Sequence, residues 1–318
     1  MQVDQIERVA VLGAGIMGTG LALIFARAGY SVRLYSIPDP SLDRAPGVIK
    51  SSLQTLADAG MLDAAAISGI MSRIQTTTDF ETLRDSQLFI EAVAEKIEVK
   101  RDIFARLDAL CGEDVIFASN TSYLNIFEAV PERRLPNTAI AHFFAPAHIV
   151  PLVEVVRGEK TSDATVAFLV EILKKVGNVP VVMEKYVPGF CVNRIQAAIG
   201  NEVYHLLDNG YISPEGLDLA VKASFIPRAM ALGLVQRYDF TGIDLSLQNL
   251  KNGTYKYPEY TEPPKCLQYR ADKGWLGAKT GKGFYDYSGR TLQEINKDRD
   301  SMLLRIFKSV GDLIYKHV

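Results

Sequence analysis

The chain has 318 residues, of which 48% are hydrophobic and 23% are charged, which is typical of a globular protein with two domains. The formal net charge of −2 provides no electrostatic reason to expect a nucleic acid or an anionic membrane as a partner. Three separated cysteines without metal-ligand spacing, and no apolar run of membrane-spanning length, predict a cytoplasmic protein without a bound metal.

Short β-branched runs alternate with amphipathic stretches over the first part of the chain, the pattern of a parallel sheet covered by helices. Strands are expected at residues 9–13, 31–36, 73–79, 87–93, 114–119, 138–144, 152–156 and 179–183. Helices are expected at residues 16–29, 48–61 and 98–112. The sequence therefore predicts an α/β domain with a doubly wound sheet.

The strand pattern stops after the stretch "KYVPGF", where Pro188 and Gly189 provide a hinge. Helices are expected beyond it at residues 191–210, at residues 213–223 with Ser213 as the cap, and within residues 301–314. We therefore expect the sheet domain to occupy residues 1–186 and a smaller, all-helical domain to occupy residues 187–318.

The stretch "VAVLGAGIMGTG" places three glycines after the first strand and at the start of a helix. Gly13 allows a tight turn, Gly15 lets a pyrophosphate approach the backbone, and Gly18 brings helix and strand together. Ile16 and Met17 lie between them, where the N–H groups of the helix start face the phosphates. An ordinary strand–turn–helix is the alternative, but the position at the first strand favours a Rossmann-type dinucleotide site.

The second strand ends in Ser36, where a carboxylate would ordinarily bind the adenosine ribose of NAD. Without that carboxylate a 2′-phosphate is not repelled at this position, so NADP stays open. No arginine follows at once, because Asp39 precedes Arg44. We therefore expect NAD as the cofactor.

One imidazole and one carboxylate occur in the apolar stretch "HFFAPAHIVPLVEV" at residues 142–155. A core strand with two satisfied polar residues is the alternative interpretation. His205 lies on a predicted helix and His317 in the last residues, so neither is a good catalytic candidate. His142 ends a strand at the cofactor edge, and Glu154 begins the next apolar strand. If the strands are neighbours, the carboxylate can fix the imidazole tautomer.

The stretch "ASNTS" adds Ser119, Asn120 and Thr121 at the end of the fifth strand. A turn or a helix cap is the alternative explanation of this polar cluster.

Six motifs, "GAGIMG", "EAVAEKIEVK", "FASNTS", "HFF…P…LVEV", "PGFCVNR" and "GWLGAKTGKGFYDYSG", follow one another in order. In this order the chain resembles the 3-hydroxyacyl-CoA dehydrogenase family from about residue 7 to residue 289, and the bacterial 3-hydroxybutyryl-CoA dehydrogenases in overall plan. The resemblance implies a Rossmann-type domain, a helical dimer-forming domain and therefore a homodimer, and NAD-dependent oxidation of an L-3-hydroxyl to a 3-ketone.

Carried onto the matching positions, the resemblance makes His142 the general base and Glu154 its orienting partner. Ser122 and Asn193 would hydrogen-bond the hydroxyl or keto oxygen. Positions that the family uses around the dinucleotide fall on Glu95, Lys100, Asn120 and Lys279. Hydride transfer to a nicotinamide beside a neutral imidazole agrees with these roles.

Three departures from the family concern the substrate. The helix that grips CoA keeps Ser52 but has Asp58 and Ala59 where cations are expected, which weakens the capture of phosphates. The stretch at 142–155 differs from the family pattern at Ala145, His148 and Pro151, and its "PLVEV" ending is similar to relatives such as the gulonate and carnitine dehydrogenases.

The third departure is the longer stretch "SFIPRAMALGLVQRYDFTG", which introduces Arg228 and Arg237. Either arginine could clamp a substrate carboxylate, and a surface salt bridge is the alternative for each.

Two enzymatic hypotheses follow. The first is a short-chain 3-hydroxyacyl-CoA dehydrogenase, and the second is the same chemistry on a free 3-hydroxy acid or another small carbonyl compound. A non-catalytic dinucleotide-binding protein is disfavoured, because it would have no physical need for the polar set at 122, 142, 154 and 193.

Overall fold

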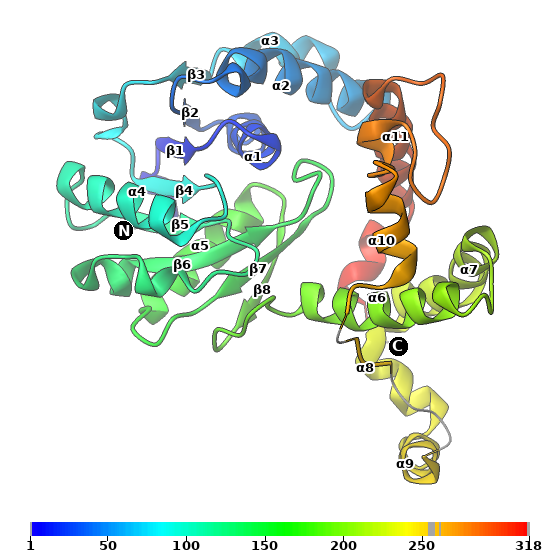
Figure 1. Cartoon of the computed structure of the whole chain (residues 1–318). Helices are drawn as coiled ribbons and strands as arrows, with labels where there is room; N and C mark the ends of the chain where they lie inside the picture. The colour runs from blue at the N-terminus through cyan, green and yellow to red at the C-terminus, as the bar shows by residue number, and fades with distance from the viewer. Residues whose placement is uncertain (1, 254–257, 261, 317–318) are drawn as a thin grey trace. The chain divides into compact units, whose positions relative to one another are not determined.

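The chain folds as two compact units, Met1–Arg194 and Ile195–Val318. The computed structural model describes residues 2–253, 258–260 and 262–316, so His317 lies outside the described residues. The first unit is an α/β domain built on one sheet, and the described part of the second is helical (Figure 1). The domain division expected between residues 186 and 187 stays a prediction. No helix among the described residues is long and apolar enough to cross a membrane.

The sheet of the first unit has the strand order β3-β2-β1-β4-β5-β6-β7-β8 (Figure 1). Its strands lie where the sequence predicts them: β1 Arg8–Leu12, β2 Ser31–Tyr35, β3 Ile74–Thr77, β4 Leu88–Glu91, β5 Ile116–Ser119, β6 Thr138–Phe143, β7 Leu152–Val156 and β8 Val179–Met183. All pairings are parallel except β6 with β7, which is antiparallel. The predicted doubly wound sheet is therefore confirmed, and it is mostly parallel with one antiparallel pairing.

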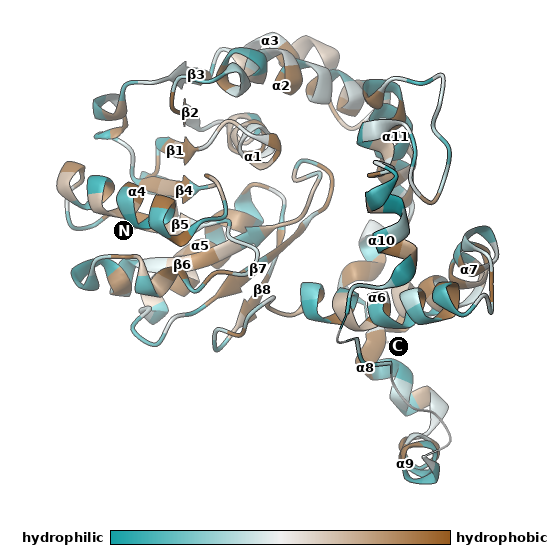
Figure 2. Cartoon of the chain, viewed as in Figure 1, coloured by the Kyte–Doolittle hydropathy of each residue, from teal (hydrophilic) through white to brown (hydrophobic). Residues whose placement is uncertain are grey.

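The central strands of the sheet are buried along their whole length, as expected for strands covered on both faces. Figure 2 colours these strands largely toward the hydrophobic end of the scale. Phe89 on β4 and Phe117 on β5 pack edge to face with ring centroids 5.6 Å apart. Because β1, β2, β4, β5 and β6 run parallel, their carboxyl ends meet at one edge. That edge carries the polar residues of the candidate site.

Five α-helices belong wholly to the first unit: α1 Ile16–Arg27, α2 Pro40–Asp58, α3 Ile67–Met71, α4 Ile97–Leu110 and α5 Asp163–Lys175. Its short 3₁₀ helices are η1 Val3–Gln5, η2 Ala64–Ala66, η3 Phe80–Leu83, η4 Ile126–Glu128 and η5 Glu132–Asn137. Helix α2 begins eight positions earlier than residue 48, the expected start. Asp39 caps it by accepting from the Ser41 amide, and Pro40 fits its first turn.

The remaining helices are α6 Val192–Asp208, which spans the division, α7 Pro214–Ala220, the π-helix η6 Val221–Phe225, α8 Ile226–Thr241, α9 Ile243–Asn252, α10 Lys265–Asp272, η7 Ala278–Thr280, α11 Leu292–Val310 and η8 Gly311–Tyr315. Ser213 caps α7, as the sequence predicts. Helix α8 is interrupted at Gly233, whose φ is 69°. Helix α11 begins before residue 301 because Thr291 and Glu294 form a capping box.

Candidate active site

The glycine loop after β1 forms a cradle for phosphates. Gly13 has a φ of 108°, and its amide donates to the carbonyl of Tyr35, 2.7 Å away, at the end of β2. A Cβ on Gly18 would lie 1.7 Å from the Gly13 carbonyl oxygen, whereas a Cβ on Gly15 would meet nothing within 4 Å. The first turn of α1, where Ile16 is exposed, has no side-chain cap. The open N–H groups and the space at Gly15 therefore fit a dinucleotide pyrophosphate.

His142 and Glu154 face each other across the antiparallel pairing of β6 and β7, in direct register. The imidazole Nδ1 lies 2.8 Å from the Glu154 Oε2. Both side chains are buried, at 5% and 1% exposure. Because an ionised Glu154 can only accept, Nδ1 donates to it, and the lone pair of a neutral ring then lies on Nε2. The pair can therefore accept a proton at Nε2 and stabilise the imidazolium that results.

Glu154 has a second set of partners at the start of α6. Its Oε1 accepts from the amides of Cys191 and Val192, each 2.9 Å away. Burial opposes the ionisation of Glu154, but the bonds from His142 and these amides outweigh it and hold the pKa of Glu154 below its ordinary value. Phe190, buried with a φ of 51°, places its ring 5.2 Å from that of His142. The segment before α6 thus fixes the pair from one side.

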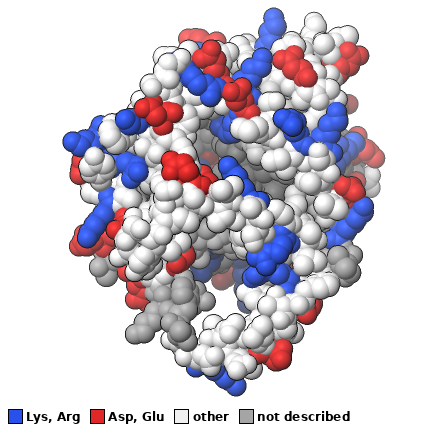
Figure 3. All heavy atoms as spheres, turned by 90° about the vertical axis from the view of Figure 1, so that its right-hand side faces the viewer, with Lys and Arg blue, Asp and Glu red and all other residues white. Residues whose placement is uncertain are grey.

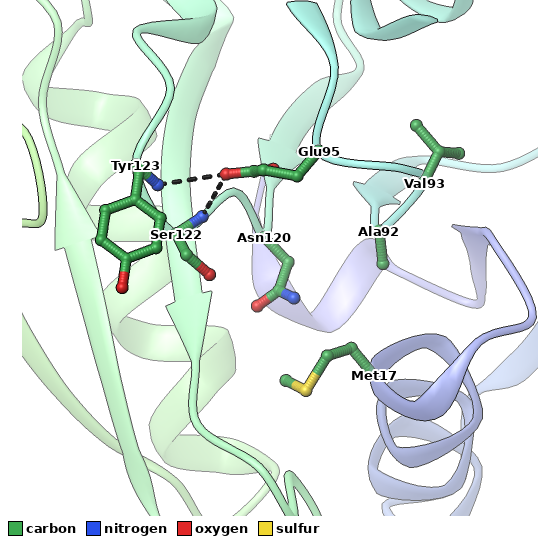
Figure 4. Close-up of a pocket in the computed structure, with 7 residues that line it drawn as sticks. All are labelled: Met17, Ala92, Val93, Glu95, Asn120, Ser122 and Tyr123. Atoms are coloured by element: carbon green, nitrogen blue, oxygen red, sulfur yellow. Dashed lines mark hydrogen bonds between the residues drawn. The ribbon is translucent and has the colours of Figure 1, made fainter. Parts of the chain in front are cut away.

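A cavity of about 330 Å³ lies at the carboxyl edge of the sheet. Figure 4 shows the seven residues that line it: Met17, Ala92, Val93, Glu95, Asn120, Ser122 and Tyr123. Asn120 is buried and its Oδ1 accepts from the amide of Phe143, 2.8 Å away, which ties the ends of β5 and β6 together. Residues predicted for cofactor binding therefore share one cavity with Ser122, predicted to contact the substrate.

Glu95 fixes the loop that carries Ser122. Its Oε1 accepts from the Thr121 hydroxyl at 2.6 Å and from the amides of Ser122 at 2.9 Å and Tyr123 at 3.1 Å; dashed lines mark the two amide bonds in Figure 4. Burial opposes the ionisation of Glu95, but Thr121, Lys100 and Ser122 together hold its pKa below the ordinary value. The carboxylate, itself part of the cavity lining, thus holds the neighbouring loop of the cavity wall in place.

Lys100 lies beneath the cavity lining, with only 1% of its side chain exposed. Its ammonium lies 2.7 Å from the Glu91 Oε1 and 3.1 Å from the Glu95 Oε2. The Glu91 Oε2 accepts from the Ser119 hydroxyl at 2.5 Å. The sequence reasoning missed Glu91, although a carboxylate at the end of the apolar run "QLFIE" is the same kind of signal that singled out Glu154.

The other predicted residues are not among the seven that line the cavity. Asn193, in the first turn of α6, and Ser52, on α2, are half-buried. In the second unit Lys279 and Arg228 are exposed, and the Arg228 Nε donates to the Ser224 carbonyl at 3.2 Å. The guanidinium of Arg237 lies 5.4 Å from the ring centroid of Tyr238. The substrate and cofactor roles of these residues stay predictions.

Two family models match most of the chain. The model of the 3-hydroxyacyl-CoA dehydrogenase NAD binding domain matches residues 8–186, and the model of the C-terminal domain of the same enzymes matches residues 189–287. The 3-hydroxybutyryl-CoA dehydrogenase of Clostridioides difficile is 36% identical over 287 residues, 88% of this chain and 99% of that protein. A 5-formyl-3-hydroxy-2-methylpyridine 4-carboxylate 5-dehydrogenase of Mesorhizobium japonicum is 31% identical over 305 residues, 95% of this chain and 97% of that protein.

Solved structures show the same two kinds of relative. A crystal structure of 5-formyl-3-hydroxy-2-methylpyridine 4-carboxylic acid 5-dehydrogenase, an NAD⁺-dependent dismutase, superposes with a TM-score of 0.84 at 27% identity, covering 96% of this chain and 99% of that one. The (S)-3-hydroxybutyryl-CoA dehydrogenase of Ralstonia eutropha gives 0.71 at 32% identity, covering 89% and 100%. The chain therefore belongs to the 3-hydroxyacyl-CoA dehydrogenase family and is an NAD-dependent dehydrogenase.

Proposed function

We propose that the chain interconverts a secondary alcohol and a ketone, with His142 as the general acid and base. NAD, held at the glycine loop of Gly13, Gly15 and Gly18, would supply the hydride acceptor for the alcohol carbon. The Nε2 of His142 takes the hydroxyl proton in the same direction, and Glu154 stabilises the imidazolium. In the reducing direction the imidazolium returns that proton to the oxygen. The buried pair at 2.8 Å is the observation that carries this proposal.

Ser122 and Asn193 hold the reacting oxygen by hydrogen bonds in this proposal. The support for Ser122 is the bond from its amide to Glu95, which leaves its hydroxyl free to turn toward the cavity. Lys100 is too buried for a direct role at the substrate, so it acts through Glu95 as a positioning residue. Its charge holds the carboxylate ionised and in place, and the carboxylate holds the Ser122 loop.

We favour a small substrate that does not carry CoA. CoA carries several phosphates, yet the end of α2 places Asp58 where cations are expected, and its carboxylate accepts from Gln54 at 2.8 Å. The dehydrogenase of the pyridine carboxylate covers 96% of this chain with a TM-score of 0.84, against 0.71 over 89% for the Ralstonia thioester enzyme. A free hydroxy acid or a related small carbonyl compound is therefore the proposed substrate class.

A short-chain 3-hydroxyacyl-CoA is the second candidate. The 36% identity with the Clostridioides difficile 3-hydroxybutyryl-CoA dehydrogenase favours it. Both candidates use the same acid–base pair, so only the substrate distinguishes them.

The test compares acetoacetyl-CoA with a panel of free keto acids, using NADH oxidation as the readout. We expect a higher kcat/KM for one or more free acids and no saturation with the thioester. Saturation by acetoacetyl-CoA at micromolar concentration would establish the second candidate instead. His142→Gln should lower kcat by about 10²–10⁴-fold on any active substrate while leaving NADH binding intact. Turnover that persists in this variant would refute the acid–base role.

The second unit exposes an apolar surface that a second copy of the chain would cover. Helix α9 places Ile243, Leu247 and Leu250 on one face, with 66%, 51% and 68% of each side chain exposed. Among the described residues of this unit, Leu304 is the one buried apolar side chain. Figure 3 shows broad uncharged areas between mixed acidic and basic side chains. We propose a homodimer, in agreement with the family resemblance.

Light scattering of Leu247→Asp would test this assembly, with Asp244→Asn on the same helix as the control. We expect the control to stay dimeric and the Leu247 variant to become monomeric. A monomeric unaltered protein, or a dimer that persists in the Leu247 variant, would contradict the proposal.

A further inference from the structure

The end of β2 lacks the expected acidic residue, yet a carboxylate reaches the same place from further along the chain. Ser36, which follows β2 directly, is 7% exposed. Its hydroxyl donates to the Asp39 Oδ2 at 3.2 Å. A carboxylate at position 36 would extend about one bond length beyond the serine hydroxyl. The Asp39 oxygen therefore lies close to where the carboxylate oxygens of an acidic residue 36 would be.

The fold holds Asp39 in this position. Its Oδ1 accepts from the amide of Ser41 at 2.5 Å and caps α2, so the side chain turns back toward the strand end. The hydrogen bonds from Ser41 and Ser36 hold the pKa of Asp39 below its ordinary value, which keeps the group ionised at neutral pH. The glycine loop lies beside it, because the Gly13 amide donates to Tyr35, the residue before Ser36.

The neighbouring sequence offers no cation to offset this charge. Residues 36–43 read "SIPDPSLD", without lysine or arginine, and Arg44 is exposed on the next turn of α2. A 2′-phosphate at the end of β2 would thus meet the Asp39 carboxylate, and residues 36–43 would offer it no cation.

We propose that Asp39, and not residue 36, determines cofactor specificity in this chain. Its carboxylate accepts hydrogen bonds from the adenosine ribose hydroxyls of NAD and repels the 2′-phosphate of NADP. The serine at position 36 supports this role by donating a hydrogen bond to Asp39, so the missing acidic residue does not make the site tolerant of NADP.

Fluorescence titrations of the full-length protein with NADH and NADPH test the proposal without any substrate. Asp39→Asn keeps an acceptor for the Ser41 amide and caps a helix as well as aspartate does, so the fold is retained. We expect this variant to tighten NADPH relative to NADH by about tenfold or more, the scale of one partly screened repulsion between charges. Asp43→Asn, an exposed carboxylate on the same helix, should leave the ratio unchanged.

A second variant distinguishes the two positions. Since Asp39 already supplies the carboxylate, Ser36→Asp should change the ratio of NADH to NADPH affinity by less than about threefold. A ratio in Asp39→Asn equal to that of the unaltered protein would overturn the proposal. So would a tenfold or larger gain in NAD preference in Ser36→Asp, because the end of β2 would then have lacked an effective carboxylate.

Discussion

Glu154→Gln is the perturbation that tests the site most directly, because three hydrogen bonds converge on that carboxylate. The amide that replaces it can still accept from Cys191 and Val192, but its NH₂ group then faces His142. The imidazole must present an unprotonated Nδ1 to that donor, which moves its proton to Nε2. Nε2 can then no longer accept the substrate proton. A wrong tautomer of this kind lowers kcat by about 10⁴-fold in the serine-protease triad, and we expect a loss of about 10³–10⁴-fold here.

The same change has a calculable effect on stability. Hydrogen bonds to a charged group contribute roughly 1 kcal/mol more than neutral ones, so three weakened bonds predict a loss of about 2–3 kcal/mol. For a unit of this size that loss corresponds to a fall in Tm of roughly 5–10 °C. Because folding lowers the pKa of Glu154, its stabilisation is complete above pH 4.5, the ordinary value, and is lost as the pH falls through the native pKa.

Three measurements on Glu154→Gln separate these effects. Steady-state kinetics gives kcat, NADH fluorescence gives cofactor affinity, and thermal melts between pH 3 and pH 8 give the stability difference. We expect intact NADH binding and a Tm difference that shrinks toward acid pH. Glu159→Gln, which alters an exposed carboxylate, serves as the control. A kcat within tenfold of the unaltered enzyme would refute the tautomer argument, and a Tm difference independent of pH would refute the pKa argument.

Two further predictions concern the buried network and the glycine loop. Lys100→Met leaves the buried Glu91 without its cation, so urea unfolding should show a loss of about 3–5 kcal/mol. The double variant with Glu91→Gln should recover part of it, and additive losses would count against the pairing. Gly18→Ala forces a Cβ against the Gly13 carbonyl, so NADH affinity should fall by about tenfold or more. Gly47→Ala is the control, because nothing lies within 4 Å of the new Cβ, and this variant should bind NADH normally. A loss of NADH affinity in it would show that replacing any helical glycine has this effect.

The strands and the two-part organisation were predictable because hydrophobic period and turn residues are local signals. The direction of a strand is harder to predict, because an apolar run has the same pattern in a parallel and in an antiparallel strand. A usable signal did exist at β6 and β7. The connection at residues 144–151 is too short for the crossover that parallel neighbours require, so length alone indicates an antiparallel pair.

Parts of the candidate site were harder to predict, for reasons that differ between residues. His142 and Glu154 stand out as polar residues in apolar runs. A lysine on a helix is expected to be exposed, and Lys100 is buried. Its spacing from Ile103 and Phe104, at i+3 and i+4, places it on the buried face of α4. The contact of Ser36 with Asp39 depends on where α2 begins, which the hydrophobic pattern does not mark.

The antiparallel pairing of β6 with β7 makes the position of the acid–base pair independent of how the two strands are connected. Because β7 returns beside β6, the positions of His142 and Glu154 are set by the ladder and not by the connection between the strands. Residues 144–151 join the two strands outside this ladder, with the ring of Phe144 4.5 Å from that of His142. All three departures of the stretch, Ala145, His148 and Pro151, fall within this connection. We therefore expect substitutions at these three positions to alter substrate preference while the ladder keeps His142 and Glu154 paired.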